Sequence, residues 1–263
     1  MSANNRKVAL VTGCSSGIGK GLAISLAQRN YVVYATARKV DSLQSLTKEY
    51  SNIKGLRLDV CDQNTIKSAV DQIIQNEGRI DLLVNNAGIS FESPAAETDL
   101  ERVKLLFNTN VIGLIAVTNE VFPHMAKAAV ELYTDGLRVE CKPFGIQVML
   151  VTPGMVKSDI CDHGNSYVKS NGYYEAFKAK FIGTFSFDED KCKDKKLLKR
   201  VMDTKVFCEG LASAIDKKYM PFSYLDGGLS YIAYAFSFLP GWVKFKAMYN
   251  FNGFGATKVI KHT

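Results

Sequence analysis

The chain has 263 residues, of which 47% are apolar and 22% charged, and these values exclude a disordered or fibrous protein. One well-buried α/β domain accounts for this length. The net charge of +7 indicates an anionic partner, either a phosphorylated cofactor, a phosphorylated substrate or a lipid surface. Nucleic acid is not the expected partner, because the basic run Lys191–Lys205 is interleaved with aspartates and lacks aromatic residues. Such a run is typical of the solvated face of a helix.

Cysteines and histidines form no recognisable metal motif. The six cysteines lack C-x-x-C spacing, and none of the three histidines lies at a zinc-motif spacing from another ligand. We therefore expect no metal site. The scattered cysteines, with an N-terminus that has no long apolar stretch, favour a reducing, intracellular compartment.

The first third of the chain alternates short β-branched runs with amphipathic stretches. Short buried runs separated by helices predict βαβ units on a parallel sheet. The pattern therefore predicts a doubly wound, Rossmann-type α/β fold. The predicted strands are Lys7–Val11, Tyr31–Thr36, Gly55–Val60 and Ile80–Asn86. The first predicted helix ends near Arg29, and the next two span Ser42–Tyr50 and Thr65–Gln75.

This alternation breaks in the second half. Helices are predicted over Asp99–Phe122 and Ala128–Cys141 with no strand between them, and the last clear strand is Gly145–Val151. We expect residues 1–160 to form the dinucleotide-binding core. Residues 161–263 are expected to form a substrate lid and an aromatic-basic C-terminal segment of the same domain.

A glycine-rich stretch, Thr12–Gly19, follows the first strand and opens a helix. Glycines allow a tight turn and close approach to a pyrophosphate, while the free N–H groups of the helix start hold the anion. Steric demands of a tight turn would also select glycine. The strand before the loop and the helix after it favour a nucleotide site that involves Gly13, Ser15, Ser16, Gly17, Ile18 and Gly19.

The end of the second predicted strand carries Arg38 and Lys39 and no carboxylate. A carboxylate here would bind a ribose 2′-hydroxyl, whereas basic side chains accommodate a 2′-phosphate. The sequence therefore predicts NADPH rather than NADH as the cofactor. The alternative is that both side chains belong to a solvated turn.

Five motifs occur in a fixed order: Thr12–Gly19, Leu58–Val60, Asn85–Gly88, Asn110–Gly113 and Pro153–Gly154. Over residues 5–160 this ordered set resembles the short-chain dehydrogenase/reductase family. The resemblance implies that Asp59 and Val60 border the adenine, that Asn86, Ala87 and Gly88 pack along the cofactor, and that Asn110 is the structural and proton-relay asparagine. It also implies that Pro153, Gly154, Val156 and Ser158 lie by the nicotinamide.

Within the family, the phrase Lys142–Val148 and the aromatic-basic tail are most similar to fungal NADPH-dependent 1-acyldihydroxyacetone-phosphate reductases. Retinol and steroid dehydrogenases are the next most similar. The resemblance implies lipid metabolism, phosphatidic acid biosynthesis and a lipid-like small-molecule substrate. It also suggests peripheral contact with the endoplasmic reticulum or a lipid droplet, otherwise a cytosolic location, and a homo-oligomer.

The catalytic segment of the resembled family has no counterpart here. Family members use a tyrosine to protonate the carbonyl oxygen, a lysine four residues on and a serine. In this sequence, Val121–Met125 runs directly into Lys127–Val130, so about 30 residues that would hold a strand, its loops and part of a helix are absent. Lys127 is either the end of the upstream piece or the catalytic lysine itself. We therefore expect an impaired reductase, or alternatively a non-catalytic NADP-binding protein on a lipid surface.

Two tyrosine–lysine pairs with the family spacing lie elsewhere, at Tyr50/Lys54 and Tyr174/Lys178. Both are interpreted as coincidental, and the alternative for the second is that Tyr174 replaces the lost acid. The aromatic segment around Leu229–Leu239 is too short to span a bilayer, which requires about 20 apolar residues. It is expected either to lie at a membrane interface or to cover the substrate pocket.

Overall fold

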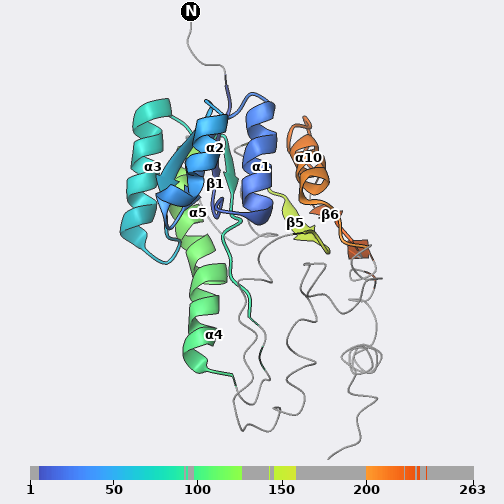
Figure 1. Ribbon diagram of the computed structural model, residues 1–263. Coiled ribbons are helices and arrows are strands. Elements are labelled where there is room, and N and C mark those ends of the chain that lie inside the picture. Colours follow the sequence, from blue (N-terminus) through green and yellow to red (C-terminus); the bar gives the residue numbers. More distant parts are fainter. Residues whose placement is uncertain are drawn as a thin grey trace, which may run out of the picture.

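The computed structural model describes residues 6–91, 93, 98–125, 142, 145–157, 200–221, 223–228, 230–231 and 235 (Figure 1). Its elements follow in the order β1 (Val8–Val11), α1 (Gly17–Gln28), β2 (Val32–Ala37), η1 (Val40–Leu43), α2 (Gln44–Glu49), β3 (Ile53–Arg57), α3 (Gln63–Glu77), β4 (Leu82–Val84), α4 (Leu100–Phe107), η3 (Asn108–Ile112), α5 (Gly113–Met125), β5 (Leu150–Pro153), α10 (Thr204–Ile215) and β6 (Ser223–Asp226).

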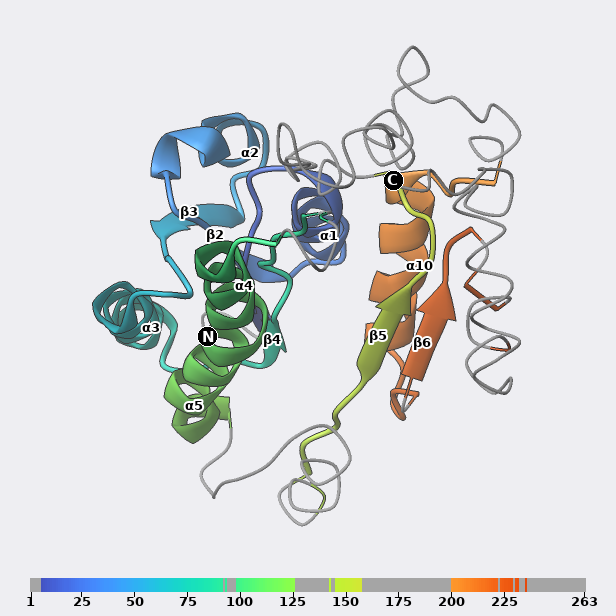
Figure 2. The same ribbon diagram turned by 90° about the horizontal axis from the view of Figure 1, so that it is seen from below.

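Four parallel strands form the main sheet in the order β3-β2-β1-β4. Every residue of β1 and β2 is buried, which agrees with their continuous apolar runs. One hydrophobic cluster lies between the sheet and helices α1 and α10, and a second lies between the sheet and helices α3 and α5 (Figure 2). Helices thus cover both faces, which confirms the predicted doubly wound, Rossmann-type α/β fold.

The ends of α3 show how local sequence fixes a helix. The Asp62 carboxylate accepts a hydrogen bond from the Asn64 N–H at 3.0 Å, so one free donor of the first turn is satisfied. Gly78 ends the helix with φ of 73°, a left-handed conformation that glycine adopts without a Cβ penalty. Helix α3 therefore has a definite length and packs its apolar face under β1 and β2.

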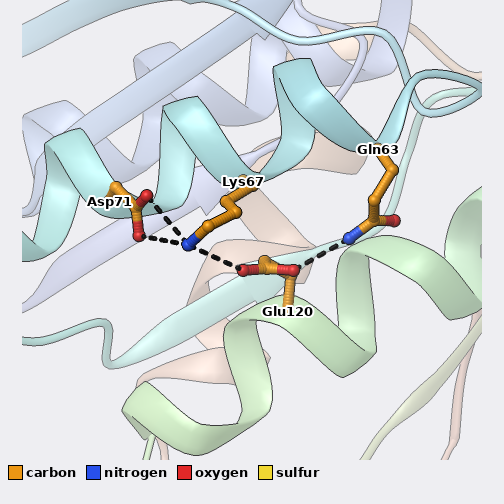
Figure 3. Close-up of polar contacts among 4 residues, drawn as sticks. All are labelled: Gln63, Lys67, Asp71 and Glu120. Carbon is orange, nitrogen blue, oxygen red and sulfur yellow. Dashed lines mark hydrogen bonds and ion pairs between the residues drawn. The ribbon is translucent and has the colours of Figure 1, made fainter.

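A polar cluster joins α3 to α5 on the outside of that layer (Figure 3). Lys67 Nζ lies 3.0 Å from Asp71 Oδ2 on its own helix and 4.0 Å from Glu120 Oε1 on α5. Gln63 Nε2 donates to Glu120 Oε2 at 2.8 Å. Glu120 is the shared member, so it connects the two helices that carry the second core cluster.

Helices α4 and α5 continue through the π-helical turn η3 as one helix. Residues Leu100–His124 have the length and apolar composition of a membrane span. Val117 and Val121 on α5, however, are fully buried in the second core cluster. Leu105 and Phe107 on α4 are instead more than half exposed. The α5 part is therefore a core helix of the sheet.

Strand β5 pairs with β6 in a second, two-stranded parallel sheet. It begins at Leu150, so the predicted strand Gly145–Val151 was placed too early. Among the described residues, β4 pairs only with β1 and β5 only with β6. Most of residues 126–144, where a strand was predicted to be lost, lie outside the described residues, so that deletion stays a prediction. The predicted helix Ala128–Cys141 also lies outside them.

Candidate nucleotide-binding site

The glycine-rich loop leaves the carboxyl end of β1 in a conformation that requires glycine. Gly13 has φ of 73°, and a Cβ there would lie 2.8 Å from the Ala87 Cα. The next residue, Cys14, donates its N–H to the Thr36 carbonyl of β2 at 2.8 Å. The loop is therefore held between the ends of β2 and β4, where the carboxyl edge of a parallel sheet forms its ligand crevice.

Asn86 and Thr12 clamp this loop to the segment after β4. The Asn86 Nδ2 donates to the Thr12 and Gly13 carbonyls at 2.9 and 3.0 Å. The Thr12 hydroxyl accepts the N–H groups of Asn86 and Ala87, each at 3.0 Å. The sequence predicted Asn86 and Ala87 as lining residues, and the structure adds Thr12 as the side chain that joins the two loops. The signal in the sequence was that Thr12 is the first residue of the glycine-rich motif.

The start of α1 presents free backbone donors next to this loop. Ser16 is the N-cap, and its side chain makes no cap hydrogen bond. The first-turn N–H groups therefore keep the partial positive charge of a helix start, and no acidic side chain lies in that turn to neutralise it. A Cβ on Gly19 would overlap the Asn86 amide and the Gly13 carbonyl, so the helix can begin this close to the loop only with glycine.

Arg38 and Lys39 lie where β2 ends, and both are exposed. The Lys39 carbonyl accepts a hydrogen bond from the Ser42 hydroxyl at 2.6 Å, which fixes the turn that follows. Neither cation has an ion-pair partner among the described residues. The side chains are thus available to an anion at the carboxyl end of the sheet.

Asp59 and Val60 follow β3 at the neighbouring strand end. The Asp59 carboxylate accepts a hydrogen bond from the Cys61 N–H at 3.0 Å, and the backbone N–H of Asp59 donates to the Thr65 hydroxyl at the same distance. Val60 is buried and touches Gly113, where any Cβ would lie 2.8 Å away. Val60 therefore secures this strand end to α5, and its predicted contact with adenine stays a prediction.

Asn110 lies in the π-helical turn and binds the segment after Asn86. Its Oδ1 accepts the Ile89 N–H at 2.9 Å, and its Nδ2 donates to the Ile89 carbonyl at 2.8 Å. Gly88 lies directly beside the Asn110 amide. The structural role predicted for this asparagine fits both hydrogen bonds, whereas proton relay remains a prediction.

Pro153, Gly154 and Val156 lie at or just after the end of β5 in the second sheet. Gly154 follows β5 and donates its N–H to the Asp226 carbonyl at 2.7 Å, and Val156 is buried in the same core cluster as Cys14. Pro153 is exposed at the end of β5. Ser158 and Lys127 lie outside the described residues, as does the Tyr174/Lys178 pair.

Helix α10 was not predicted, yet it contacts the first turns of α1, the helix that follows the glycine-rich loop. The Cys208 Sγ donates to the Ile18 carbonyl at 3.5 Å, and Gly21 leaves room for Cys208 and Thr204 against α1. Burial raises the pKa of Cys208 and of Cys14 to about 12, so both thiols stay protonated and act as packing groups. The sequence favoured a helix with its solvated face over Lys191–Lys205, whereas the observed helix begins only at Thr204 and continues to Ile215, and residues 191–199 lie outside the described residues.

No tyrosine–lysine pair with a catalytic geometry appears among the described residues. Lys54 donates to Glu77 and to the Tyr34 hydroxyl in the layer under α3, so it does not support Tyr50. Three buried or partly buried tyrosine hydroxyls donate to carboxylates, and burial is the main cause that raises each pKa above its usual value. These hydroxyl–carboxylate pairs are Tyr31–Asp216, Tyr34–Glu77 and Tyr224–Asp226.

The loop, the helix start and the basic strand end define a Rossmann-type dinucleotide-binding protein. The profile of the family described as short chain dehydrogenase matches residues 7–128. A 3-ketodihydrosphingosine reductase of Bacteroides thetaiotaomicron is 31% identical over 187 residues, which cover 60% of this chain and 67% of the relative. The NADPH-dependent 1-acyldihydroxyacetone phosphate reductase of Schizosaccharomyces pombe is 32% identical over 184 residues, covering 59% of this chain and 61% of that enzyme.

The chain belongs to the short-chain dehydrogenase family. It spans about three fifths to two thirds of the length of the curated relatives that it matches. A solved short-chain dehydrogenase from Streptomyces avermitilis matches with a TM-score of 0.72 and 22% identity, covering 97% of this chain and all of the other. That likeness is one of fold.

Proposed function

We propose that this chain binds NADPH at the carboxyl edge of the β3-β2-β1-β4 sheet and is a carbonyl reductase by descent. The observation that carries the proposal is the clamped loop, in which Asn86 and Thr12 hold Gly13 beside the open N-terminus of α1. Such a site suits a pyrophosphate, because preformed N–H donors need no rearrangement to bind it.

The residues present fit a phosphorylated dinucleotide. A left-handed glycine and a glycine without room for a Cβ leave space for a pyrophosphate close to the backbone. The exposed Arg38 and Lys39 would neutralise a 2′-phosphate, with the guanidinium as a bidentate donor. NADPH, when bound, would supply a hydride. The chain's own residues would position it, and Asn110 would hold the Gly88–Ile89 backbone against the bound ring system.

We further propose that the substrate is a lipid-like carbonyl compound of the 1-acyldihydroxyacetone phosphate type. Two relatives of similar identity, named above, reduce ketone-bearing lipids according to their names. The net charge of +7 suits a phosphorylated substrate. Residues 161–263 would then supply the lid over that substrate, and residues 1–160 the nucleotide-binding core.

Catalysis by this chain is proposed to be weak. Tyr31, Tyr34 and Tyr224 each donate to a carboxylate, and a phenol whose pKa is raised is a poorer proton donor at neutral pH. Loss of a positioned general acid costs on the order of 10²–10⁴ in rate. A non-catalytic NADP-binding role is therefore the second candidate function.

Fluorescence titration of the purified chain tests cofactor choice. We expect saturable NADPH binding, and Arg38→Ser should weaken it by about tenfold while leaving NADH affinity unchanged, since only NADPH carries the 2′-phosphate. Arg79→Ser is the matched control, because Arg79 is exposed and pairs with Asp81 just before β4, away from the carboxyl edge of the sheet. Equal effects of both substitutions on NADPH would contradict the assignment.

Turnover assays then separate the two candidate functions. NADPH oxidation with 1-acyldihydroxyacetone phosphate or 3-ketodihydrosphingosine would support a reductase. Tight NADPH binding with no oxidation above background would support the binding protein. Absence of any NADPH binding would contradict both candidate functions.

A further inference from the structure

A second concave site lies on the outward side of α1 and begins at Gly17, the first residue of that helix. A groove of about 540 Å³ runs between α1 and α10, which lie side by side in both ribbon views (Figures 1 and 2). It is lined by residues of α1, α10 and the segments after α2 and β5: Gly17, Lys20, Gly21, Ile24, Ser25, Gln28, Tyr50, Lys157, Asp203, Thr204 and Lys205.

The groove exists because of how α1 meets α10. A Cβ on Gly21 would lie 3.0 Å from the Cys208 Sγ and 3.2 Å from the Thr204 Cγ2, so the helices touch closely at this point. Leu22 and Leu26 face the sheet and are buried. The other face of α1, through Lys20 and Ile24, is left to form the groove wall.

One end of the groove is cationic. Lys20, Lys157 and Lys205 lie there with a single carboxylate, Asp203. That carboxylate already accepts the Lys205 N–H at 2.8 Å as the cap of α10. Lys205 is also 3.9 Å from Glu209, whereas Lys20 and Lys157 have no ion-pair partner in the described part of the chain. Two uncompensated ammonium groups thus line the same cavity.

The other end of the groove is less polar. Ile24 and the Tyr50 ring line it, together with the Gln28 side chain at the end of α1. With a rise of 1.5 Å per residue, Lys20 and Gln28 are about 12 Å apart along the helix axis. The groove therefore offers charge at one end and apolar contact at the other, over the length of a short amphiphile.

We propose that this groove binds a phosphate monoester that carries a short hydrocarbon part. A phosphomonoester is close to a dianion at neutral pH and matches the charge of Lys20 and Lys157. Lysine binds such a group as a point charge, without the planar geometry that arginine imposes. Ile24 and Tyr50 contact the hydrocarbon part. The groove adjoins the nucleotide crevice at Gly17 and extends from there along α1 to Gln28, so it is a neighbouring site whose ligand does not depend on the function proposed above.

Calorimetric titration of the full chain with monohexyl phosphate, and with inorganic phosphate for comparison, tests the proposal. Saturable binding is expected, with the hexyl ester binding more tightly. The double variant Lys20→Gln/Lys157→Gln should weaken it about tenfold or more, because hydrogen bonds to charged groups are lost. The matched control is Lys104→Gln/Lys217→Gln, which removes the same charge from exposed sites on α4 and after α10.

Three results would overturn the proposal: no saturable binding, equal weakening by both double variants, or complete displacement of hexyl phosphate by NADP⁺. The last would place the phosphate in the nucleotide crevice. Thermal melting of each variant verifies that it is folded. Hexyl phosphate binding that persists under saturating NADP⁺ supports the groove. Binding of hexyl phosphate without any NADPH binding would support the groove and contradict the proposed function.

Vesicle sedimentation identifies the source of the phosphate. Vesicles of phosphatidylcholine with phosphatidic acid are compared with phosphatidylcholine alone. Sedimentation that needs phosphatidic acid and is lost in Lys20→Gln/Lys157→Gln supports a lipid headgroup in the groove. Binding of hexyl phosphate without sedimentation supports a soluble ester. If the chain neither binds hexyl phosphate nor sediments with the vesicles, the proposed site is wrong.

Discussion

The clamp made by Asn86 permits a quantitative test of how the nucleotide site is held. Asn86→Ala removes two hydrogen bonds, from Nδ2 to the Thr12 and Gly13 carbonyls. At roughly 1 kcal/mol each, their loss should lower the free energy of unfolding by about 2 kcal/mol. The loop would also lose its preset shape, so part of the binding free energy would be spent on ordering the loop. We expect NADPH affinity to fall by about tenfold.

The chain contains a matched control for this substitution. Asn52 also donates its Nδ2 to two backbone carbonyls, those of Ala27 and Tyr31, at 2.8 and 2.9 Å. It lies before β3, at the amino end of the sheet, on the side away from the glycine loop. Asn52→Ala should therefore cost about the same stability and leave NADPH binding unchanged.

Urea unfolding measures the first quantity and fluorescence titration the second. A loss of NADPH affinity in both variants would mean that general destabilisation weakens binding. No loss of affinity in Asn86→Ala would mean that the loop keeps its shape without the amide. Either outcome would refute the clamp as the feature that prepares the site.

Other substitutions and reagents test separate parts of the structure. Gly19→Ala should prevent stable folding of the loop, because its Cβ would overlap two neighbours, whereas Gly78→Ala, with nothing within 4 Å, should cost only about 1–2 kcal/mol of left-handed strain in a urea melt. Burial acts to raise the pKa of Glu77, but its lysine and tyrosine hydrogen bonds outweigh burial and hold that pKa below the usual value. The resulting stability is present above the unfolded carboxyl pKa and is lost as the pH falls through the folded one, so Glu77→Gln should flatten the acid limb of a melting curve. Maleimide labelling followed by peptide mapping should modify the exposed Cys61 within minutes and spare Cys14, whose pKa burial raises to about 12, until the chain is unfolded.

The strands and helices around the nucleotide site were predictable because each has a signal in its own local sequence. β1 and β2 are continuous apolar runs, and α3 has an aspartate cap and a terminal glycine. β3 was placed two residues late, since its observed start at Ile53 precedes the apolar run that was identified. Boundaries of this kind depend on pairing with β2, which sequence alone does not record.

The second sheet and α10 were harder to predict for physical reasons. β5 begins at Leu150 because only that part of the apolar run pairs with β6, a partner about 70 residues away. Helix α10 begins at Thr204, directly after its N-cap Asp203, but the preceding basic run concealed that signal. Helix α10 packs closely against α1 at Gly21, and no local pattern indicates a contact between helices so distant in sequence.

The nucleotide site is nearly self-contained within the first third of the chain. The clamp, the open helix start and the basic strand end all come from residues 12–39 and 84–89, with Asn110 as support from the helix after them. Each of these contacts is made within or across the four-stranded sheet and does not use residues 126–144. Loss of a strand there would therefore remove catalytic groups before it removed the loop that binds the nucleotide. For this reason cofactor binding and turnover have to be measured separately, since the physical basis of the first does not guarantee the second.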